Sequence, residues 1–239
     1  MVRTVTATLC FVLFTASAAS AETKTYPLTT LEGTTNKEVV ATPVVYKGQE
    51  GLHVTVSPEH KSIEEGGCDN CTFVALDGID FANGTIEIEV AGKPTEGAPD
   101  WARGFVGIIL RADLEADTYE GLYLRPLNAT ADTQIQRNRT VQYFAYPDHP
   151  WHVLREATPG HYESYAPIEV AEWTSMRIDV DGEELRLYLN GAETAALVVA
   201  DLKLGADQHG TIGLFTEPAT DAYFRNLVVT PRQAGFMAR

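Results

Sequence analysis

Long apolar runs are scarce in this sequence, and so is positive charge. The one extended apolar run lies near the N-terminus and is too short to cross a membrane as a helix. Lysine and arginine together number 18, against 33 aspartates and glutamates, and the net charge is −15. Such an acidic chain is repelled by phosphate backbones and by anionic lipid surfaces. We therefore expect no membrane span and no nucleic-acid partner, and we interpret the acidity as a contribution to solubility.

Familiar catalytic signatures are also missing. The sequence contains no Gly-x-Ser-x-Gly nucleophile elbow, no His-Glu-x-x-His zinc motif and no phosphate-binding loop. No motif therefore assigns this sequence to the serine hydrolases, the metalloproteases or the nucleotide-binding enzymes. Function has to be inferred from the pattern of strands and from the residues that they carry.

The first residues have the pattern of a secretory signal peptide. A basic start at Arg3 leads into the apolar run LCFVLF, and small residues ending at Ala21 follow. We expect cleavage after Ala21, with Ala18 as the alternative, and an exported protein, periplasmic or extracellular. The predicted organisation is a signal peptide over residues 1–21, one domain over 22–230 and a loose tail over 231–239.

Cysteine is rare, with three in the chain. Cys10 lies in the apolar run of the signal and is expected to be removed with it. Cys68 and Cys71 form a single C-x-x-C pair, without the second pair that a zinc site of this kind needs. Because an exported setting favours oxidation, we predict a disulfide that pins a local turn. A thiol redox site is the alternative.

Alternation of apolar and polar residues dominates the rest of the chain and predicts β-strands. In TIEIEV, residues 85–90, three apolar side chains point one way and two glutamates the other. Turn dipeptides such as Asp181-Gly182 and Asn190-Gly191 follow several of these segments. The predicted strands cover residues 52–56, 85–90, 104–111, 119–125, 140–145, 176–180, 184–190, 211–216 and 223–230.

Strands that are polar on one side must bury their other sides against one another. For a chain of this length, the simplest solution is one domain made of two packed antiparallel sheets. We therefore predict an all-β fold, a two-sheet β-sandwich of the jelly-roll kind. The sequence leaves the oligomeric state open.

Several spaced motifs carry a family resemblance. EWTSMRIDVDGEELRLYLNG, GTIGLFT and YFRNLVV resemble the second half of a concanavalin A-like, or laminin G-like, sandwich. The preceding NGTIEIEV, GFVGIILRA and YEGLYLRP resemble the bacterial branch described as family 16 glycoside-hydrolase-like or 3-keto-disaccharide hydrolase-like. The resemblance covers about residues 70–230. It implies a carbohydrate ligand or substrate, and it leaves the activity open, because the superfamily holds lectins, binding modules, hydrolases and lyases.

Arginines and tyrosines follow the polar side of the predicted strands. If Leu122 and Leu124 face the core, the residues that alternate with them lie on the opposite face. Guanidinium forks suit sugar hydroxyls, and flat phenol rings suit pyranose faces. The candidate Arg/Tyr face comprises Arg111, Tyr119, Tyr123, Arg125, Arg186 and Tyr188, and Arg137, Arg139, Gln142 and Tyr143 could extend it. The alternative is an ordinary solvated face, in which the arginines pair with the many acids.

The segment 147–167 is rich in proline, histidine and aromatic residues and shows little periodicity. Loops this long in a compact domain are usually functional or disordered, and the aromatics argue against disorder. We predict one wall of a binding cleft, with His149, Trp151, His152 and Tyr165 in contact with the ligand. A structural flap anchored by Trp151 is the alternative.

Acids and bases occur in two places where catalysis can be considered. In the loop 147–167, Asp148, His149, His152 and Glu163 are the candidates. The segment 115–120, EADTYE, fits the spacing E-x-D-x-x-E of family 16 glucanases, but it falls between two strands and lacks their intervening apolar residues. We predict that EADTYE is an exposed acidic turn without a catalytic role.

Structural calcium is common in the superfamily that this chain resembles. The resemblance implies Asp80, Gly84 and Asp221, near predicted strand ends, as ligands. Ordinary acidic surface turns are the alternative interpretation. No other cofactor is expected.

Three functional hypotheses follow. The first is a non-catalytic carbohydrate-binding protein that uses the Arg/Tyr face and the 147–167 loop. The second is a glycoside hydrolase or lyase, including one that acts on 3-keto sugars, and the third is a protein-interaction domain. Carboxylates or histidines that converge on one cleft would favour the enzyme. An aromatic platform without them would favour binding, and a broad apolar patch would favour interaction.

Overall fold

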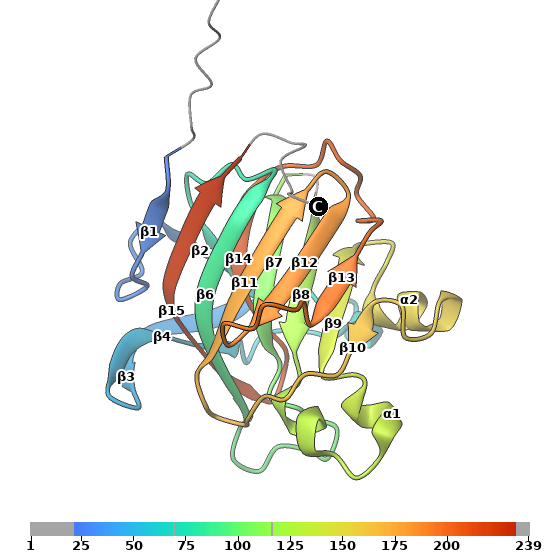
Figure 1. The fold of residues 1–239 in the computed structure, drawn as a ribbon. Coiled ribbons are helices and arrows are strands. Elements are labelled where there is room, and N and C mark those ends of the chain that lie inside the picture. The colour runs from blue at the N-terminus through green and yellow to red at the C-terminus, as the bar shows by residue number, and fades with distance from the viewer. Residues whose placement is uncertain (1–21, 69, 116, 233–239) are drawn as a thin grey trace, which may run out of the picture.

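The computed structural model describes residues 22–68, 70–115 and 117–232. In this part of the chain two antiparallel β-sheets pack face to face, as predicted (Figure 1). The expected signal peptide lies outside the described residues, and so does almost all of the predicted tail. No helix in the described ranges is long and apolar enough to cross a membrane.

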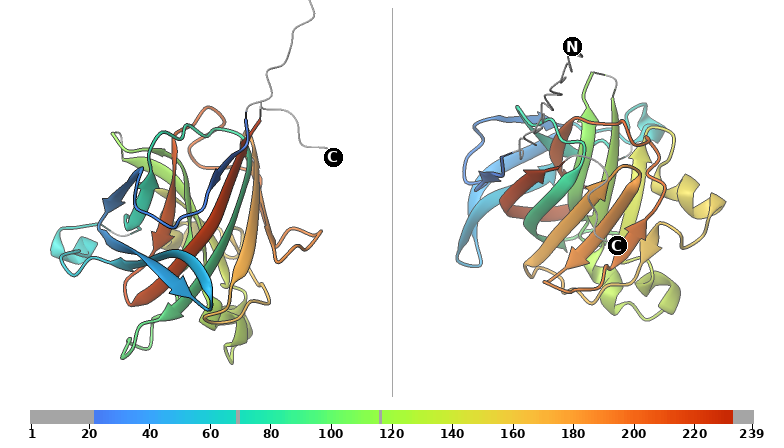
Figure 2. Two further views of the ribbon diagram at one scale, coloured as in Figure 1. Left: turned by 90° about the vertical axis from the view of Figure 1, so that its left-hand side faces the viewer. Right: turned by 45° about the horizontal axis from the view of Figure 1, so that its top comes forward.

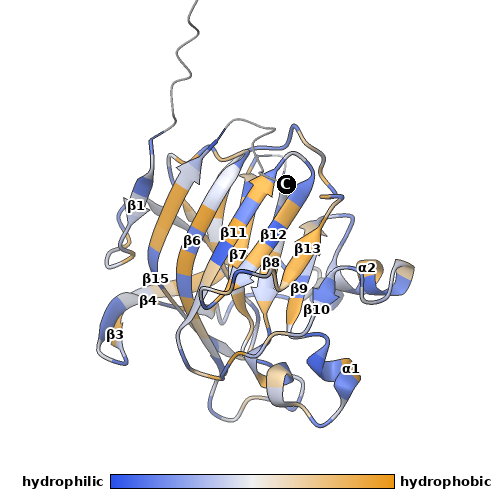
Figure 3. Ribbon diagram, in the orientation of Figure 1, coloured by the Kyte–Doolittle hydropathy of each residue, from blue (hydrophilic) through white to orange (hydrophobic). Residues whose placement is uncertain are grey.

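One sheet has eight strands. Alternate residues of its strands are buried, and the hydropathy therefore changes from residue to residue along them (Figure 3). Its long central pair places Gly84 opposite Pro231 at one end and Lys93 opposite Asp221 near the other. In order of pairing the strands are β13 (Leu197–Val199), β12 (Glu184–Leu189), β11 (Thr174–Asp181), β6 (Gly84–Pro94), β15 (Thr220–Pro231), β4 (Gln49–Val56) and β3 (Val39–Tyr46), and β1 (Lys24–Tyr26) pairs with β15.

The other sheet has seven strands and carries the helical segments at one edge. In order of pairing the strands are β10 (Glu163–Ser164), β9 (Val141–Tyr146), β8 (Thr118–Leu124), β7 (Val106–Asp113), β14 (Thr211–Thr216), β5 (Phe73–Leu76) and β2 (Thr34–Lys37). Two short α-helices, α1 (Gln134–Arg137) and α2 (Trp151–Ala157), lie beside β10 (Figure 1). Two 3₁₀ turns, η1 (Ile63–Glu65) and η2 (Pro126–Thr130), complete the elements of the described chain.

The seven-stranded sheet is buried on both faces. Leu122 and Leu124 point into the main core between the two sheets, as predicted. Tyr123, Phe144 and Phe215 alternate with such residues and form a second, aromatic cluster on the outer face. The left view of Figure 2 shows the two sheets edge-on. The outer face of this sheet is therefore a covered aromatic floor, in place of the open polar face expected from the alternation.

Glycines make room for the rings of this aromatic floor. Gly121 pairs with Phe144 across β8 and β9, and a Cβ atom at Gly121 would lie 2.2 Å from the Phe144 ring. Gly107 pairs with Tyr123, and a Cβ atom there would lie 2.6 Å from the Tyr123 Cβ. The Phe144 ring thus occupies the space that a side chain at Gly121 would need, and the backbone of Leu122 and Tyr123 leaves no room for one at Gly107.

The disulfide prediction is confirmed, since a disulfide joins Cys68 and Cys71. Asn70 lies within the short loop that this bond closes, and its φ angle is 61°. The backbone carbonyl of Asn70 accepts a hydrogen bond from the hydroxyl of Tyr119 at 3.2 Å. The cross-link and this hydrogen bond together hold the loop against the aromatic floor.

An ionic network fills one part of the space between the sheets and corrects three predictions. Arg111 and Tyr143 were expected on the ligand face, and Glu120 in an exposed turn, but all three are fully buried. Glu120 accepts a hydrogen bond from the Tyr143 hydroxyl at 2.9 Å and lies 3.5 Å from the Arg111 guanidinium. Burial lowers the pKa of Arg111 and raises that of Glu120. Glu115 is exposed, as predicted.

A β-bulge explains the position of Arg111. The pairing of β7 with β8 shifts register between Leu110 and Asp113, and Arg111 has a φ angle of 54°. A bulged residue interrupts the regular alternation of side chains. Arg111 therefore turns inward, although the period-2 pattern assigns it to the outer face.

Candidate carbohydrate-binding site

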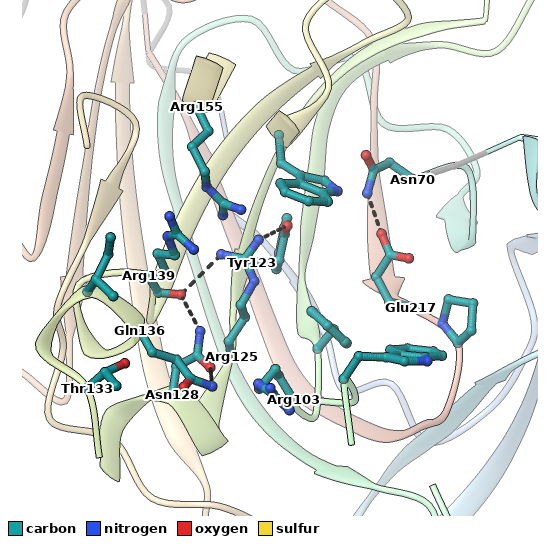
Figure 4. A pocket seen from close by; sticks show the side chains of 15 residues that line it. Asn70, Arg103, Tyr123, Arg125, Asn128, Thr133, Gln136, Arg139, Arg155 and Glu217 are labelled. Carbon is teal, nitrogen blue, oxygen red and sulfur yellow. Dashed lines mark hydrogen bonds between the residues drawn. The ribbon is translucent and has the colours of Figure 1, made fainter. Parts of the chain in front are cut away.

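A large hollow lies on the outer face of the seven-stranded sheet, and we call it the Arg–Trp pocket. Its volume is about 630 Å³, which is within the usual range for ligand sites. Figure 4 shows the residues that line it. They are Asn70, Trp101, Arg103, Phe105, Tyr123, Arg125, Asn128, Thr133, Ile135, Gln136, Arg139, Trp151, Arg155, Glu217 and Pro218.

Segments far apart in the sequence meet at this pocket. Tyr123 belongs to β8, and Arg125 follows directly after that strand. Arg139 lies between α1 and β9, while Trp151 and Arg155 lie on α2, one turn apart on the same helix face. The opposite side is formed by the loop before β7, by the disulfide loop and by the turn between β14 and β15.

Arg125 is the buried centre of the pocket floor. Its Nη2 donates to the Tyr123 hydroxyl at 2.6 Å, and its Nη1 donates to the backbone carbonyl of Arg139 at 3.1 Å. The guanidinium also stacks over the Tyr123 ring, 4.7 Å from its centroid. Only 7% of the side chain is exposed, and burial lowers the pKa of the guanidinium. Arg125 therefore has two roles. It supports the floor of the pocket, and it also lines the space that a ligand would occupy.

A single buried carboxylate pairs with three of the arginines. Glu163, on β10, has only 5% of its side chain exposed. Arg155 donates to it through Nε at 3.1 Å and also through Nη2. The guanidiniums of Arg125 and Arg139 lie 3.7 and 3.9 Å from its oxygens. Three cations thus share one anion at this side of the pocket.

Aromatic side chains form the walls. The Trp151 ring lies 4.4 Å from the Arg155 guanidinium, which stacks over it. Trp101, in the loop before β7, is 55% exposed. Indole rings next to guanidinium donors give both an apolar surface and hydrogen-bond donors, the combination that sugar rings require.

One carboxylate lines the pocket in the described part of the chain. Glu217, in the turn between β14 and β15, accepts a hydrogen bond from the Asn70 side-chain amide. Asn70 is 2% exposed, and among the described residues its Oδ1 atom has no hydrogen-bond partner. Figure 4 places this pair across the pocket from Arg139 and Arg155. The pocket therefore has a cationic side and a side with a single oriented carboxylate.

The structure brings together only some of the residues proposed from the sequence. Tyr123, Arg125, Arg139 and Trp151 line the pocket. Gln142 lies beneath it, fully buried, with its side-chain oxygen 3.4 Å from Arg125 and Arg155 donors. The remaining candidates from the Arg/Tyr face and the 147–167 segment do not line it; they are Arg111, Tyr119, Arg137, Tyr143, His149, His152, Tyr165, Arg186 and Tyr188.

Several of these omissions have a structural cause. Arg186 and Tyr188 lie on β12, which belongs to the other sheet. Asp148 and His152 are exposed, and the His149 backbone pairs with Ala145. The two histidines therefore do not converge with a carboxylate at the Arg–Trp pocket, and the acid/base candidates of this segment reduce to Glu163, which is held by arginines.

The candidate calcium ligands do not form one site. Lys93, the residue paired with Asp221, lies nine positions along β6 from Gly84. Gly84 and Asp221 therefore lie about 30 Å apart. Asp221 lies 2.9 Å from His53 and 3.5 Å from Lys93, while Asp80 pairs with His209. Cationic partners and this separation do not fit a shared calcium ion.

A different group, His60, Cys68 and Cys71, places possible metal-ligand atoms within 4.8 Å of one another. The two sulfurs are joined to each other, however, and a disulfide offers no thiolate to a metal.

Three of the five charged residues that line the pocket, Arg103, Arg155 and Glu217, were not predicted from the sequence. Arg155 follows Trp151 by four positions, and recognising WHVLREA as a helix would have placed both on one face. Glu217 and Arg103 lie next to predicted strands, but no pattern in the sequence indicates that their loops meet. Such meetings depend on strand order, which alternation does not reveal.

The family described as the 3-keto-alpha-glucoside-1,2-lyase-like domain matches residues 29–230. The chain belongs to that family. The resemblance drawn from the strand motifs is therefore confirmed. No curated protein sequence matches this member of the family closely.

Two solved structures have a fold similar to that of this family member. The carbohydrate binding module CBM66 from Bacillus subtilis is similar with a TM-score of 0.54 and 15% identity, over 82% of this chain and 95% of that one. The Crh5 transglycosylase, solved in complex with NAG, is similar with a TM-score of 0.53 and 12% identity, over 90% and 86% of the two chains. At these identities the likeness establishes the fold alone, a two-sheet β-sandwich.

Proposed function

We propose that this protein, after export from the cytoplasm, binds a saccharide in the Arg–Trp pocket. The observation that carries the proposal is the pocket itself, where four guanidiniums and two indoles surround one hollow of about 630 Å³. Guanidiniums donate to sugar hydroxyls, and indoles cover the apolar faces of pyranose rings. The signal-like N-terminus and the Cys68–Cys71 disulfide support export.

Replacing Trp101 by alanine is expected to weaken saccharide binding about tenfold or more, the usual effect of removing an aromatic anchor from a binding site. The side chain is 55% exposed, so its loss should leave the unfolding transition almost unchanged. Isothermal titration of residues 22–239 with a panel of plant and microbial oligosaccharides measures the effect. Tyr188→Ala, on the other sheet, is the control, and equal losses in the two variants would contradict this location of the site.

A second candidate function is the elimination named in the family description. Ordinary glycoside hydrolysis uses two carboxylic acids that flank the scissile bond, whereas only Glu217 lines the pocket among the described residues. One base suffices for elimination from a 3-keto glycoside, because the C3 carbonyl acidifies the C2 proton. Glu217 would take that proton, the electron pair would form the C1–C2 double bond, and the leaving alkoxide would recover a proton from the same carboxyl.

The arginines would stabilise the negative charge that develops on the C3 oxygen during this elimination. Asn70 would hold the Glu217 carboxylate in place through the hydrogen bond that it donates. The specific observation in favour of this candidate is therefore one oriented carboxylate that faces guanidinium donors across the pocket.

Glu217→Gln is expected to lower the rate of aglycone release from a 3-keto-α-glucoside about 100-fold or more, the effect of losing a general base, with saccharide affinity kept within a few-fold. Chromatography of the released aglycone follows the rate. Glu115→Gln is a matched change at an exposed turn and should leave the rate within a few-fold. If wild-type protein releases no aglycone from the keto sugar, the protein binds saccharide without this reaction.

A further inference from the structure

Arg139 and Arg155 line two hollows. Besides the Arg–Trp pocket, both residues line a smaller hollow of about 350 Å³, together with Glu163, Ser164 and Tyr165. Tyr165 is 46% exposed there. The two guanidiniums therefore lie where the hollows adjoin, with indole rings on one side and a phenol ring on the other.

The positive charge at this boundary exceeds the negative charge. Arg125, Arg139 and Arg155 are all within 4 Å of Glu163, which is a single carboxylate. Both hollows together add one further acid, Glu217, on the far side of the larger one. A partly buried group of like charges is unfavourable unless a counter-charge reaches it. This concentration of arginines is also unusual in a chain whose net charge is −15.

The outer two arginines have donors directed away from Glu163. Arg155 donates to that carboxylate through Nε and Nη2. Its Nη1 makes no hydrogen bond to any described residue. Arg139 is 35% exposed, and its nearest approach to Glu163, 3.9 Å, is too long for a hydrogen bond. Arg125, by contrast, is saturated by buried partners.

We infer that the protein recognises an acidic oligosaccharide, with one sugar in each hollow and the carboxylate of a uronic acid held between Arg139 and Arg155. The inference rests on the proposed function of the Arg–Trp pocket. Guanidinium forks bind carboxylates in a bidentate manner, and an added carboxylate offsets the excess charge. Trp151 and Tyr165 stand on either side of the boundary as surfaces for the two adjoining rings.

Calorimetric titration of residues 22–239 with trigalacturonic acid and with its methyl ester tests the inference. The two probes share the same sugar rings and linkages, but in the ester each carboxylate is replaced by an uncharged methyl ester. We expect the acid to bind about tenfold or more tightly than the ester at low salt, and we expect this preference to shrink at 0.5 M salt, where the Debye length is about 4 Å. The salt dependence is measured on the unaltered protein and needs no variant.

Arg139→Gln should remove about tenfold of the affinity for the acid and a clearly smaller part of the affinity for the ester, because the ester offers no carboxylate to the guanidinium. Arg137→Gln is the matched control, because Arg137 lies two residues away, lines neither hollow and donates to the Ala131 carbonyl. A loss of acid affinity in the control equal to that in Arg139→Gln would overturn the inference. Unfolding curves of both variants confirm that the comparison is made on folded protein.

The remaining outcomes separate this inference from the proposed function. Equal binding of acid and ester would overturn the inference and leave saccharide binding in place. Failure of every saccharide in the panel to bind would overturn both. The last outcome comes from a competition experiment. If a sulfated monosaccharide or inorganic sulfate displaced the bound uronide at a lower concentration than free uronide does, the uronate assignment would be overturned. The site would then prefer a sulfate.

Discussion

Replacing Arg111 by methionine is expected to lower the free energy of unfolding by about 3 to 5 kcal/mol, the usual cost of breaking a buried ion pair from one side. Methionine fills much of the same space but donates no hydrogen bond. The change would leave the buried carboxylate of Glu120 without its cation. The guanidinium also donates to Ala82 O, Gly182 O, Gly205 O and Asn83 Oδ1.

Urea unfolding measures this effect, provided that the slope of the transition is unchanged. Arg177→Met is the control, because Arg177 is 44% exposed and pairs with Asp179 at 3.8 Å, so its loss should cost less than about 1 kcal/mol. Adding Glu120→Gln to Arg111→Met should restore part of the stability by removing the unpaired charge. A loss below 1 kcal/mol in Arg111→Met would mean that the network between the sheets is not stabilising.

Arg125→Ala is expected to damage both folding and binding. With 7% of the side chain exposed, truncation should cost about 3 to 5 kcal/mol. It would remove the donor that holds the Tyr123 hydroxyl and the Arg139 carbonyl. Because that carbonyl is part of the pocket wall, saccharide affinity per folded molecule should also fall, by about tenfold or more. A position on the outer face of a strand would by itself suggest a loss of binding with little loss of stability, but the burial of Arg125 adds the loss of stability.

The two effects are separated by measuring affinity at a temperature where Arg125→Ala is still folded, with the folded fraction taken from its own unfolding curve. Arg139→Ala provides the contrast, because its more exposed side chain should affect binding and leave stability within about 1 kcal/mol. Full stability in Arg125→Ala would show that the hydrogen bonds of its guanidinium contribute little to the fold.

Alternation was sufficient to predict the sandwich and many of its strands. The predicted strand 211–216 coincides with β14, and 119–125 differs from β8 by one residue at each end. Strand β5, Phe73–Leu76, was missed because all four of its residues are buried, so no alternation marks it. Helix α2 was missed because its seven residues lie among prolines and glycines that suggested a loop.

The candidate site was predictable only where one strand carries it. Tyr123 and Arg125 follow from the alternation of β8, and Arg139 and Trp151 from composition. Neighbouring residues Gln142 and Tyr143 were assigned to the same face, although successive strand residues point in opposite directions, and Tyr143 faces the core. Glu217 and Trp101 reach the pocket from loops, and their approach depends on the pairing order of β14, β7 and β8.

The glycines beneath the aromatic floor limit how this site can be redesigned. Even a methyl group would collide with the backbone of Leu122 and Tyr123 at Gly107, and with the Phe144 ring at Gly121. Either collision would displace part of the floor on which the pocket rests. The depth of the site is thus fixed by positions that have no side chain to vary. New specificity would have to come from the surrounding loops, at Trp101, α2 or the turn that bears Glu217, where a change of residue alters the rim without lifting the floor.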